Sequence, residues 1–271
     1  MTSRRLLFIM SFVMLAVGPM LLLLYLADPV TGVEQYGYRV LYKKPQHRRL
    51  YVQGLEIHDD HLYVSGGLYG ESSLERYAFD TMTLETERQL DARLFAEGLT
   101  VFDDRVYLLT WRAQQMLVFD RKKLELLESF PIAGQGWGLT NDGKRLIYSD
   151  GSDRLYFLAP QTEFVERSLK VTENGQPLHR LNELEWVEDE IWANIYQTDR
   201  IVVIDPTSGE VRASIDLSGL LPRVEHKPDT SVLNGIARDP ADGAIWVTGK
   251  RWPWLYRIEL VPLDELQNIR D

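Results

Sequence analysis

The sequence of 271 residues contains no cysteine, only five histidines and very little helical periodicity beyond its N-terminal end. Without cysteine the protein has no thiol nucleophile, no thiolate metal site and no disulfide. Its formal net charge of −10 opposes binding to nucleic acids and to anionic lipids, because both carry the same sign of charge. With 45% apolar residues the chain can still build a large core. The composition therefore favours a folded protein that does not bind polyanions.

A long uncharged segment near the N-terminus differs from the rest of the chain. Residues 6–27 read LLFIMSFVMLAVGPMLLLLYLA and follow Arg4 and Arg5. A helix of this length crosses about 30 Å of hydrocarbon, and the basic flank is expected to stay in the cytoplasm. We therefore expect an uncleaved membrane anchor and a periplasmic remainder. A signal peptide cleaved after Ala27 is the alternative, although Tyr25 is a poor residue for the −3 position.

The rest of the chain consists of short alternating or apolar runs separated by turn residues, which predicts an all-β protein. Five stretches repeat one pattern, in which a Gly-Leu or similar step is followed by a turn and a second apolar run. They begin at Gln53, Glu97, Trp137, Asn182 and Asn234. The spacing of 40 to 52 residues is that of a four-stranded propeller blade.

The last repeat has no outer strand, whereas an unmatched strand, YGYRVLYKK, precedes the first repeat. Pairing these two would close a ring and remove exposed strand edges. An open sandwich or a solenoid would explain neither feature. The sequence thus predicts a five-bladed β-propeller over residues 34–262, closed by its N-terminal strand, after an anchor or signal segment (1–33) and before a short tail (263–271).

Equivalent positions in the repeats should form rings around the central axis of a propeller. The position before each Gly-Leu step is occupied by Gln53, Glu97, Trp137, Asn182 and Asn234. The end of the second strand is occupied by Gly67, Trp111, Gly151, Tyr196 and Lys250. Because these residues differ in chemistry, they suggest a functional site at the opening of the central channel. The alternative is that the polar groups only satisfy the backbone at strand ends.

A metal centre is not expected in these rings. A hard divalent cation prefers several carboxylates, and Glu97 is the one acid among these positions. His58 and His61 lie in a polar turn beside Asp59 and Asp60, where a surface role is more common than zinc binding. No metal ligands are therefore assigned and no cofactor is expected to be required, although a structural cation in the central channel is left open.

From Tyr51 to Leu260 the sequence resembles the plant-type glutaminyl cyclases, or glutaminyl-peptide cyclotransferases, which also occur in bacteria. The resemblance lies in a series of ordered motifs: QGL at Gln53, GLYGESSL at Gly67, EGLT at Glu97, LTWR at Leu109, GWGLTNDGKRLIYSDGS at Gly136, RLNELEW at Arg180, IWANIYQTDRI at Ile191, VLNGIA at Val232 and VTGKRWP at Val247. It implies a five-bladed propeller that converts N-terminal glutaminyl residues of peptides and proteins to pyroglutamyl residues and releases ammonia.

The resemblance also implies roles for individual residues. Glu97 would anchor the α-ammonium group and carry its proton, and Lys250 would stabilise the developing oxyanion. Gln53 and Asn182 would bind the substrate amide, and Asn234 occupies the same ring. The aromatic walls would come from Phe95, Trp111, Trp137 and Tyr196. Expected partners are peptides with N-terminal glutamine and, through the first helix, the membrane; the protein is expected to be a monomer.

Two positions depart from the pattern of the family. Many members carry LYEST where this chain has LYVSG, so that Val64 replaces an acid, and Tyr196 replaces a tryptophan. If the missing acid carried the proton, the protein would be slow or would bind N-terminal glutamine without converting it. A non-catalytic propeller that binds an exported peptide or protein is therefore the alternative function, and a metal-dependent lactone or ester hydrolase is a third.

Overall fold

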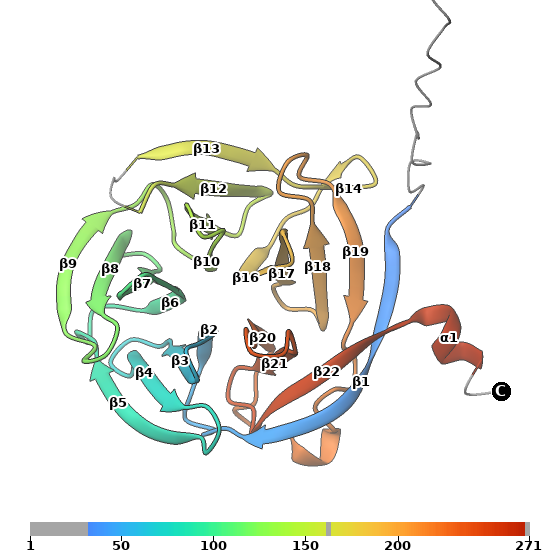
Figure 1. Cartoon of the computed structure of the whole chain (residues 1–271), viewed down its shortest axis with the longest axis horizontal. Helices are drawn as coiled ribbons and strands as arrows, with labels where there is room; N and C mark the ends of the chain where they lie inside the picture. The colour runs from blue at the N-terminus through green and yellow to red at the C-terminus, as the bar shows by residue number, and fades with distance from the viewer. Residues whose placement is uncertain (1–31, 161–163, 269–271) are drawn as a thin grey trace, which may run out of the picture. The chain divides into compact units, whose positions relative to one another are not determined.

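The computed structural model describes residues 32–160 and 164–268. The expected anchor, residues 1–33, lies almost entirely outside the described residues. Among the described helices none is long and apolar enough to cross a membrane. The described chain is an arrangement of β-sheets around a common centre, with one short helix at its C-terminal end (Figure 1).

Three sheets contain four consecutive antiparallel strands each. The first contains β2 (Val52–His58), β3 (His61–Gly66), β4 (Ser73–Ala78) and β5 (Thr83–Gln89). The second contains β6 (Ala96–Phe102), β7 (Arg105–Thr110), β8 (Gln115–Asp120) and β9 (Leu126–Pro131). The third contains β10 (Leu139–Asn141), β11 (Leu146–Ser149), β12 (Arg154–Leu158) and β13 (Val165–Lys170).

The remaining large sheet has eight strands in the order β16-β17-β18-β19-β1-β22-β21-β20. Its members are β16 (Leu181–Val187), β17 (Glu190–Ile195), β18 (Arg200–Ile204), β19 (Val211–Asp216), β1 (Glu34–Pro45), β22 (Trp254–Pro262), β21 (Ile245–Gly249) and β20 (Leu233–Arg238). Small additional elements are β14 (Thr172–Glu173), β15 (Gln176–Pro177), the 3₁₀ turn η1 (Arg223–Glu225) and α1 (Leu263–Asn268).

Strand β1 joins the two halves of the eight-stranded sheet. It pairs antiparallel with β22 from Tyr36 to Pro45 and parallel with β19 from Glu34 to Tyr36. The pairing of the early strand with the last repeat, expected from the sequence, is therefore confirmed. It covers the edge of β22, which would otherwise present unpaired backbone groups.

The inner strands lie around the centre of the molecule. Strand β2 contacts β6 and β20, β10 contacts β6 and β16, and β16 contacts β20, so the inner strands form a closed cycle. At Gly138 a Cβ atom would lie 1.8 Å from the carbonyl oxygen of Asn182, so only glycine allows this close approach of neighbouring strands. Apolar clusters fill the spaces between sheets; one joins Tyr63 and Leu74 to Leu99 and Leu108.

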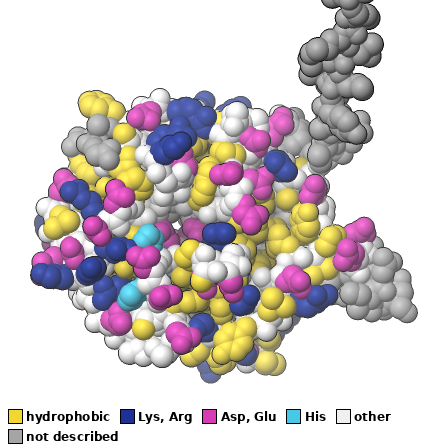
Figure 2. Space-filling view, in the orientation of Figure 1, with side chains coloured by type: hydrophobic (Ala, Val, Ile, Leu, Met, Phe, Trp, Pro, Cys, Tyr) yellow, Lys and Arg dark blue, Asp and Glu magenta, His cyan; other side chains and the backbone are white. Residues whose placement is uncertain are grey.

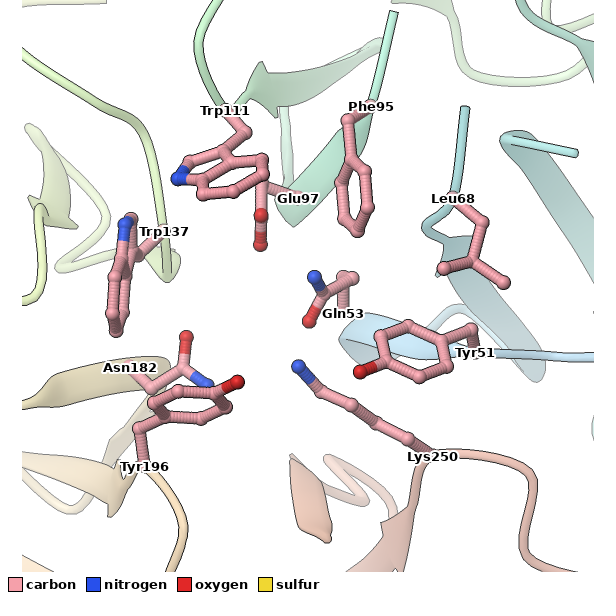
Figure 3. Close-up of a pocket in the computed structure, with 10 residues that line it drawn as sticks. All are labelled: Tyr51, Gln53, Leu68, Phe95, Glu97, Trp111, Trp137, Asn182, Tyr196 and Lys250. Carbon is pink, nitrogen blue, oxygen red and sulfur yellow. The ribbon is translucent and has the colours of Figure 1, made fainter. Parts of the chain in front are cut away.

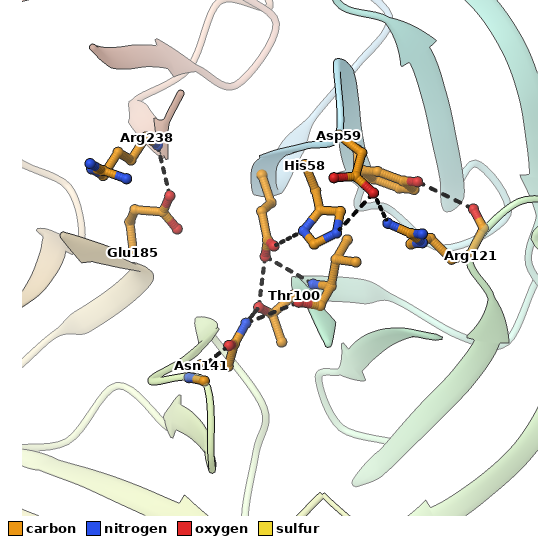
Figure 4. Close-up of polar contacts among 11 residues, drawn as sticks. His58, Asp59, Thr100, Arg121, Asn141, Glu185 and Arg238 are labelled. Carbon is orange, nitrogen blue, oxygen red and sulfur yellow. Dashed lines mark hydrogen bonds and ion pairs between the residues drawn. The ribbon is translucent and has the colours of Figure 1, made fainter. Parts of the chain in front are cut away.

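Buried glutamate side chains connect inner strands that are not hydrogen-bonded neighbours. The Glu183 carboxylate of β16 accepts hydrogen bonds from the amides of Leu55 (3.2 Å) and Ile236 (2.9 Å). The Glu185 carboxylate accepts one from the amide of Arg238 at 2.7 Å (Figure 4). The Glu56 carboxylate accepts hydrogen bonds from the neighbouring strand β6, at the Thr100 hydroxyl and the Val101 amide. These groups tie the inner strands together across the centre of the fold.

Candidate active site

A pocket of about 250 Å³ lies where the inner strands begin. Ten side chains line it: Tyr51, Gln53, Leu68, Phe95, Glu97, Trp111, Trp137, Asn182, Tyr196 and Lys250 (Figure 3). The polar members come from equivalent places in the sheets. Gln53, Glu97 and Asn182 are each the second residue of an inner strand, and Lys250 directly follows the second strand of its group. The ring geometry expected from the repeats thus brings together residues up to about 200 positions apart in the chain.

Glu97 and Lys250 are the ionisable pair of the pocket, and their side chains point toward its centre from different sides (Figure 3). Glu97 is 5% exposed and Lys250 is 3% exposed. Burial raises the pKa of the Glu97 carboxyl well above its ordinary range, and the Lys250 ammonium offsets part of this rise. Burial lowers the pKa of Lys250 to about 8, against the opposite influence of Glu97.

No hydrogen bond or ion pair links the Glu97 carboxylate to Lys250 in the part of the chain that the structure describes. The space between them is therefore available to a ligand. The Lys250 ammonium lies over the rings of Tyr51 and Tyr196, with its nitrogen 4.9 and 5.2 Å from the ring centres. These contacts stabilise a cation that has lost most of its water.

The carboxamide groups are oriented by a chain of hydrogen bonds. Asn234 is fully buried, and its amide nitrogen donates to the backbone carbonyls of Val52 (3.0 Å) and Gln53 (3.3 Å). Its oxygen accepts a hydrogen bond of 2.6 Å from the amide nitrogen of Asn182. Because this bond uses the Asn182 nitrogen, the Asn182 oxygen is left to face the pocket (Figure 3). Asn234 therefore lies behind the pocket wall and orients Asn182.

Gln53 presents a second unused acceptor. Its side-chain oxygen is buried and has no hydrogen-bond partner among the described residues. A buried acceptor without a donor carries a cost in free energy, which a bound donor would remove. The Gln53 side chain extends into the pocket between Glu97 and Lys250 (Figure 3). The site thus offers several acceptors to a ligand that carries N–H donors.

Aromatic side chains form much of the pocket wall. Phe95 meets Trp111 edge to face with ring centres 5.5 Å apart, and Trp137 meets Tyr196 in the same way at 5.4 Å. The small residue Gly67 provides the space that one of these rings needs. A Cβ atom on Gly67 would lie 2.5 Å from the Phe95 ring, so a larger residue would displace Phe95. In the ring formed by the ends of the second strands, Gly67 and Gly151 therefore leave space for the neighbouring aromatic rings of Phe95 and Trp137.

The structure brings eight of the nine predicted site residues to the pocket surface, and Asn234 is the exception described above. Tyr51 and Leu68 line the pocket without having been predicted. Tyr51 precedes Gln53 by two residues, and this period-two spacing was the signal that could have found it. Leu68 has a backbone φ of +93°, which is rare for leucine, and no pattern in the sequence indicated it.

The structure places Val64 outside the candidate active-site pocket. Its side chain is 1% exposed and packs in an apolar cluster with Leu55, Leu62 and Tyr77, and it does not line the pocket. An acid at this position would lie in the core of the first sheet, away from Glu97 and Lys250. The position of Val64 in the core therefore gives no support to a proton carrier at position 64, and the effect of Val64 on activity stays a prediction.

The polar turn with His58 and His61 lies outside the pocket. His58 contacts Asp59 at 3.6 Å, and Asp59 in turn pairs with Arg121 (Figure 4). His61 contacts Glu85 at 3.1 Å. No group of histidine and carboxylate side chains with metal-binding geometry occurs within the described residues. The face in Figure 2 carries basic and acidic side chains interspersed, without one large basic patch.

Fold and site together define a class: an all-β, propeller-like protein with an aromatic pocket. Its inner strands present a carboxylate and carboxamides there, and the residue after a second strand presents an amine. Residues 14–260 match the family model described as glutamine cyclotransferase. The chain therefore belongs to the glutamine cyclotransferase family.

Two relatives support this membership. The sequence is 39% identical over 206 residues to a glutaminyl-peptide cyclotransferase of Arabidopsis thaliana. The aligned region covers 74% of this chain and 64% of that protein. The chain thus spans somewhat less than two thirds of that relative's length. The crystal structure of Myxococcus xanthus glutaminyl cyclase superposes with a TM-score of 0.78 and 30% identity, covering 85% of this chain and 99% of the other.

Proposed function

We propose that the protein is a glutaminyl-peptide cyclotransferase, which converts N-terminal glutaminyl residues of peptides and proteins to pyroglutamyl residues with release of ammonia. The observation that carries this proposal is the convergence of Glu97, Lys250 and the carboxamides of Gln53 and Asn182 in one pocket. Family membership and the activity for which the two relatives are named support it.

The reaction begins with removal of a proton from the substrate ammonium group. An N-terminal amine has a pKa near 8, well above that of an ordinary carboxyl group. Because burial raises the pKa of Glu97, the difference between the two groups becomes smaller and proton transfer to Glu97 costs less. The incoming ammonium also stabilises the ionised form of Glu97 before the proton moves.

The freed amine then attacks the side-chain amide carbon of the same residue and closes a five-membered lactam. The amide oxygen gains negative charge, which the Lys250 ammonium stabilises in a pocket that excludes most water. The bond from this carbon to the amide nitrogen breaks as Glu97 gives its proton to that nitrogen, which leaves as ammonia. The ring nitrogen still carries one proton more than the neutral lactam, and Glu97 takes this proton and passes it to the departing ammonia. No atom or electron is needed from outside the substrate and these two side chains.

The acceptors of the pocket hold the substrate folded for this attack. The free oxygens of Asn182 and Gln53 are suited to the N–H groups of the substrate's ammonium and amide. The rings of Phe95, Trp111 and Trp137 enclose the apolar part of the glutaminyl side chain. Because both reacting groups belong to one residue, orientation supplies a large part of the rate acceleration.

Ammonia release from a peptide with N-terminal glutamine tests the proposal. The detergent-solubilised full chain should release ammonia, and Glu97→Gln should lower kcat by about 10²- to 10⁴-fold because it removes the proton carrier but keeps the shape. Calorimetry with the same peptide gives the matching control for binding. Wild-type binding without loss of ammonia would support the non-catalytic alternative and end the proposal.

The chemistry proposed here uses the chain's own side chains and no metal or other cofactor. Activity should therefore survive treatment with a chelator such as EDTA. Activity that is abolished by chelation and restored by a divalent cation would contradict this and would favour the metal-dependent alternative.

The finer architecture proposed is a five-bladed propeller, in which the eight-stranded sheet counts as two four-stranded blades joined by β1. A crystal structure with another number of blades would contradict this. We further place the protein as a monomer in the periplasm, held by a helix over residues 6–27. The full chain should then sediment with membranes, whereas a chain beginning at Gly32 should stay in the supernatant as a monomer by light scattering.

A further inference from the structure

The aromatic wall of the pocket has a break between its two indole rings. Ring contacts connect Tyr69 to Phe95 (5.4 Å between centres) and Phe95 to Trp111 (5.5 Å), and a separate contact connects Trp137 to Tyr196. Within residues 32–160 and 164–268, no ring contact joins Trp111 to Trp137. Figure 3 shows that each indole turns its nitrogen toward this gap.

Gln135 bridges the gap. Its side-chain oxygen accepts a hydrogen bond from the Trp111 indole nitrogen at 2.6 Å and another from the Trp137 indole nitrogen at 3.2 Å. An indole N–H group can only donate, so the group that meets both must be the oxygen and not the nitrogen of the carboxamide. A carbonyl oxygen has two lone pairs, and both are used here. The two hydrogen bonds therefore determine the orientation of the Gln135 amide.

Neither indole N–H group has another acceptor among the described residues, and the other contacts of the two rings are made by stacking and packing. The guanidinium group of Arg112 stacks on Trp111 with its carbon 4.1 Å from the ring centre. Trp137 lies directly over Gly151, where a Cβ atom would be only 2.7 Å from the ring. Contacts of this kind do not determine the direction of the N–H bond, whereas a hydrogen bond at the nitrogen does.

Gln135 acts at a distance from the reacting groups. It is exposed, lies between β9 and β10, and is not among the residues that line the pocket. Its contacts are with two side chains that do line it, and these come from different sheets. We propose that Gln135 is a positioning residue, which holds Trp111 and Trp137 as one continuous wall around the bound glutaminyl side chain. The consequence for catalysis rests on the proposed function, whereas the hydrogen-bonded clamp itself does not.

Indole nitrogen signals test the clamp without any substrate. The full chain in detergent, labelled with ¹⁵N at tryptophan, gives one N–H signal for each of its seven indoles. Trp111→Phe and Trp137→Phe assign the two signals of interest. Gln135→Leu should move both signals upfield in the proton dimension, since both N–H groups lose their acceptor. Gln135→Glu keeps an acceptor oxygen and should restore them, and the exposed control Gln176→Leu should leave them in place.

Kinetics of ammonia release test the consequence. Because the indoles enclose the substrate before and during reaction, Gln135→Leu should raise KM about tenfold, equivalent to two ordinary hydrogen bonds, and change kcat less than about threefold. Gln135→Glu should recover most of the loss. Unmoved indole signals in Gln135→Leu, or a loss confined to kcat, would overturn the proposal. If the wild type releases no ammonia, the proposed function fails and the indole signals alone decide whether the clamp exists.

Discussion

At the scale of single residues, the pocket depends on how each group is buried. Glu97 and Lys250 face the same cavity. Burial raises the pKa of Glu97 and lowers the pKa of Lys250, so it favours the neutral form of each. Each charge also opposes the shift of the other, so the two groups are tuned as a pair. Asn234 and Gln135 make no contact with this pair. They orient Asn182 and the two indoles from behind and beside the pocket.

The electrostatic coupling between Glu97 and Lys250 predicts how activity depends on pH. A protonated Glu97 cannot accept the substrate proton, so activity should fall as the pH drops through the raised pKa of Glu97. Lys250→Met removes the ammonium that lowers this pKa, and the pKa should therefore rise further. The activity of the variant should be about 10²- to 10³-fold lower than that of the wild type. In a plot of kcat/KM against pH, its acidic limb should lie at higher pH than that of the wild type. An acidic limb at the wild-type position would show that the two groups are not coupled.

At the scale of elements, strand β1 has two partners with different directions. It is antiparallel to β22 and parallel to β19, so one segment near the N-terminus completes the last group of strands and attaches it to the preceding one. Lys250 directly follows β21, which lies in the group that β1 completes. The position of Lys250 in the pocket therefore depends on a strand that begins more than 200 residues earlier.

Removal of β1 should destabilise the fold and reduce activity. A chain that begins at Gln46 lacks the strand, whereas the matched control that begins at Gly32 retains it. Loss of the pairing with β22 and β19 should cost several kcal/mol, which corresponds to a fall in Tm of roughly 10 °C or more in a protein of this size. Differential scanning calorimetry measures this. Equal Tm values for the two chains would show that β1 is not needed to close the structure.

At the scale of the whole molecule, buried carboxyl groups join inner strands across the centre. Glu183 and Glu185 have pKa values raised well above the ordinary range by burial and by neighbouring carboxylates. Burial also raises the pKa of Glu56 to about 7. Each group keeps its proton in the folded state at a pH where the unfolded chain has released it. Folding is therefore favoured at low pH, and this contribution is lost as the pH rises.

This predicts that the free energy of unfolding falls as the pH rises from about 4.5 to 7, and that it falls further above pH 7. Glu56→Gln retains an oxygen that can accept from Thr100 and Val101 but does not titrate. The free energy of unfolding of the variant should fall less than that of the wild type over this range. The difference between the two falls should reach up to about 3 kcal/mol at pH 8. Urea unfolding at several pH values measures the difference, with Glu166→Gln on the exposed face of β13 as the control. Parallel curves for wild type and Glu56→Gln would contradict the assignment.

Much of the architecture is encoded locally and could be predicted. The repeats begin at Gln53, Glu97, Trp137, Asn182 and Asn234, and all but Trp137 lie within inner strands that start at the expected places. Alternating apolar residues and turn signals are determined by neighbours in the chain, so they are readable without coordinates. The repeat also predicted which residues of different sheets would meet, because equivalent positions in a ring face a common centre.

The sequence by itself determined the all-β class, the repeating unit, the pairing of the first strand with the last and the composition of the pocket. Only the tertiary structure decided which side of its strand each residue faces. It placed Val64 in the core, Asn234 behind Asn182, and Leu68 and the Gln135 clamp at the pocket. These outcomes depend on rotamers, unusual φ angles and contacts between sheets distant in sequence, and none of these leaves a periodic signal in the chain.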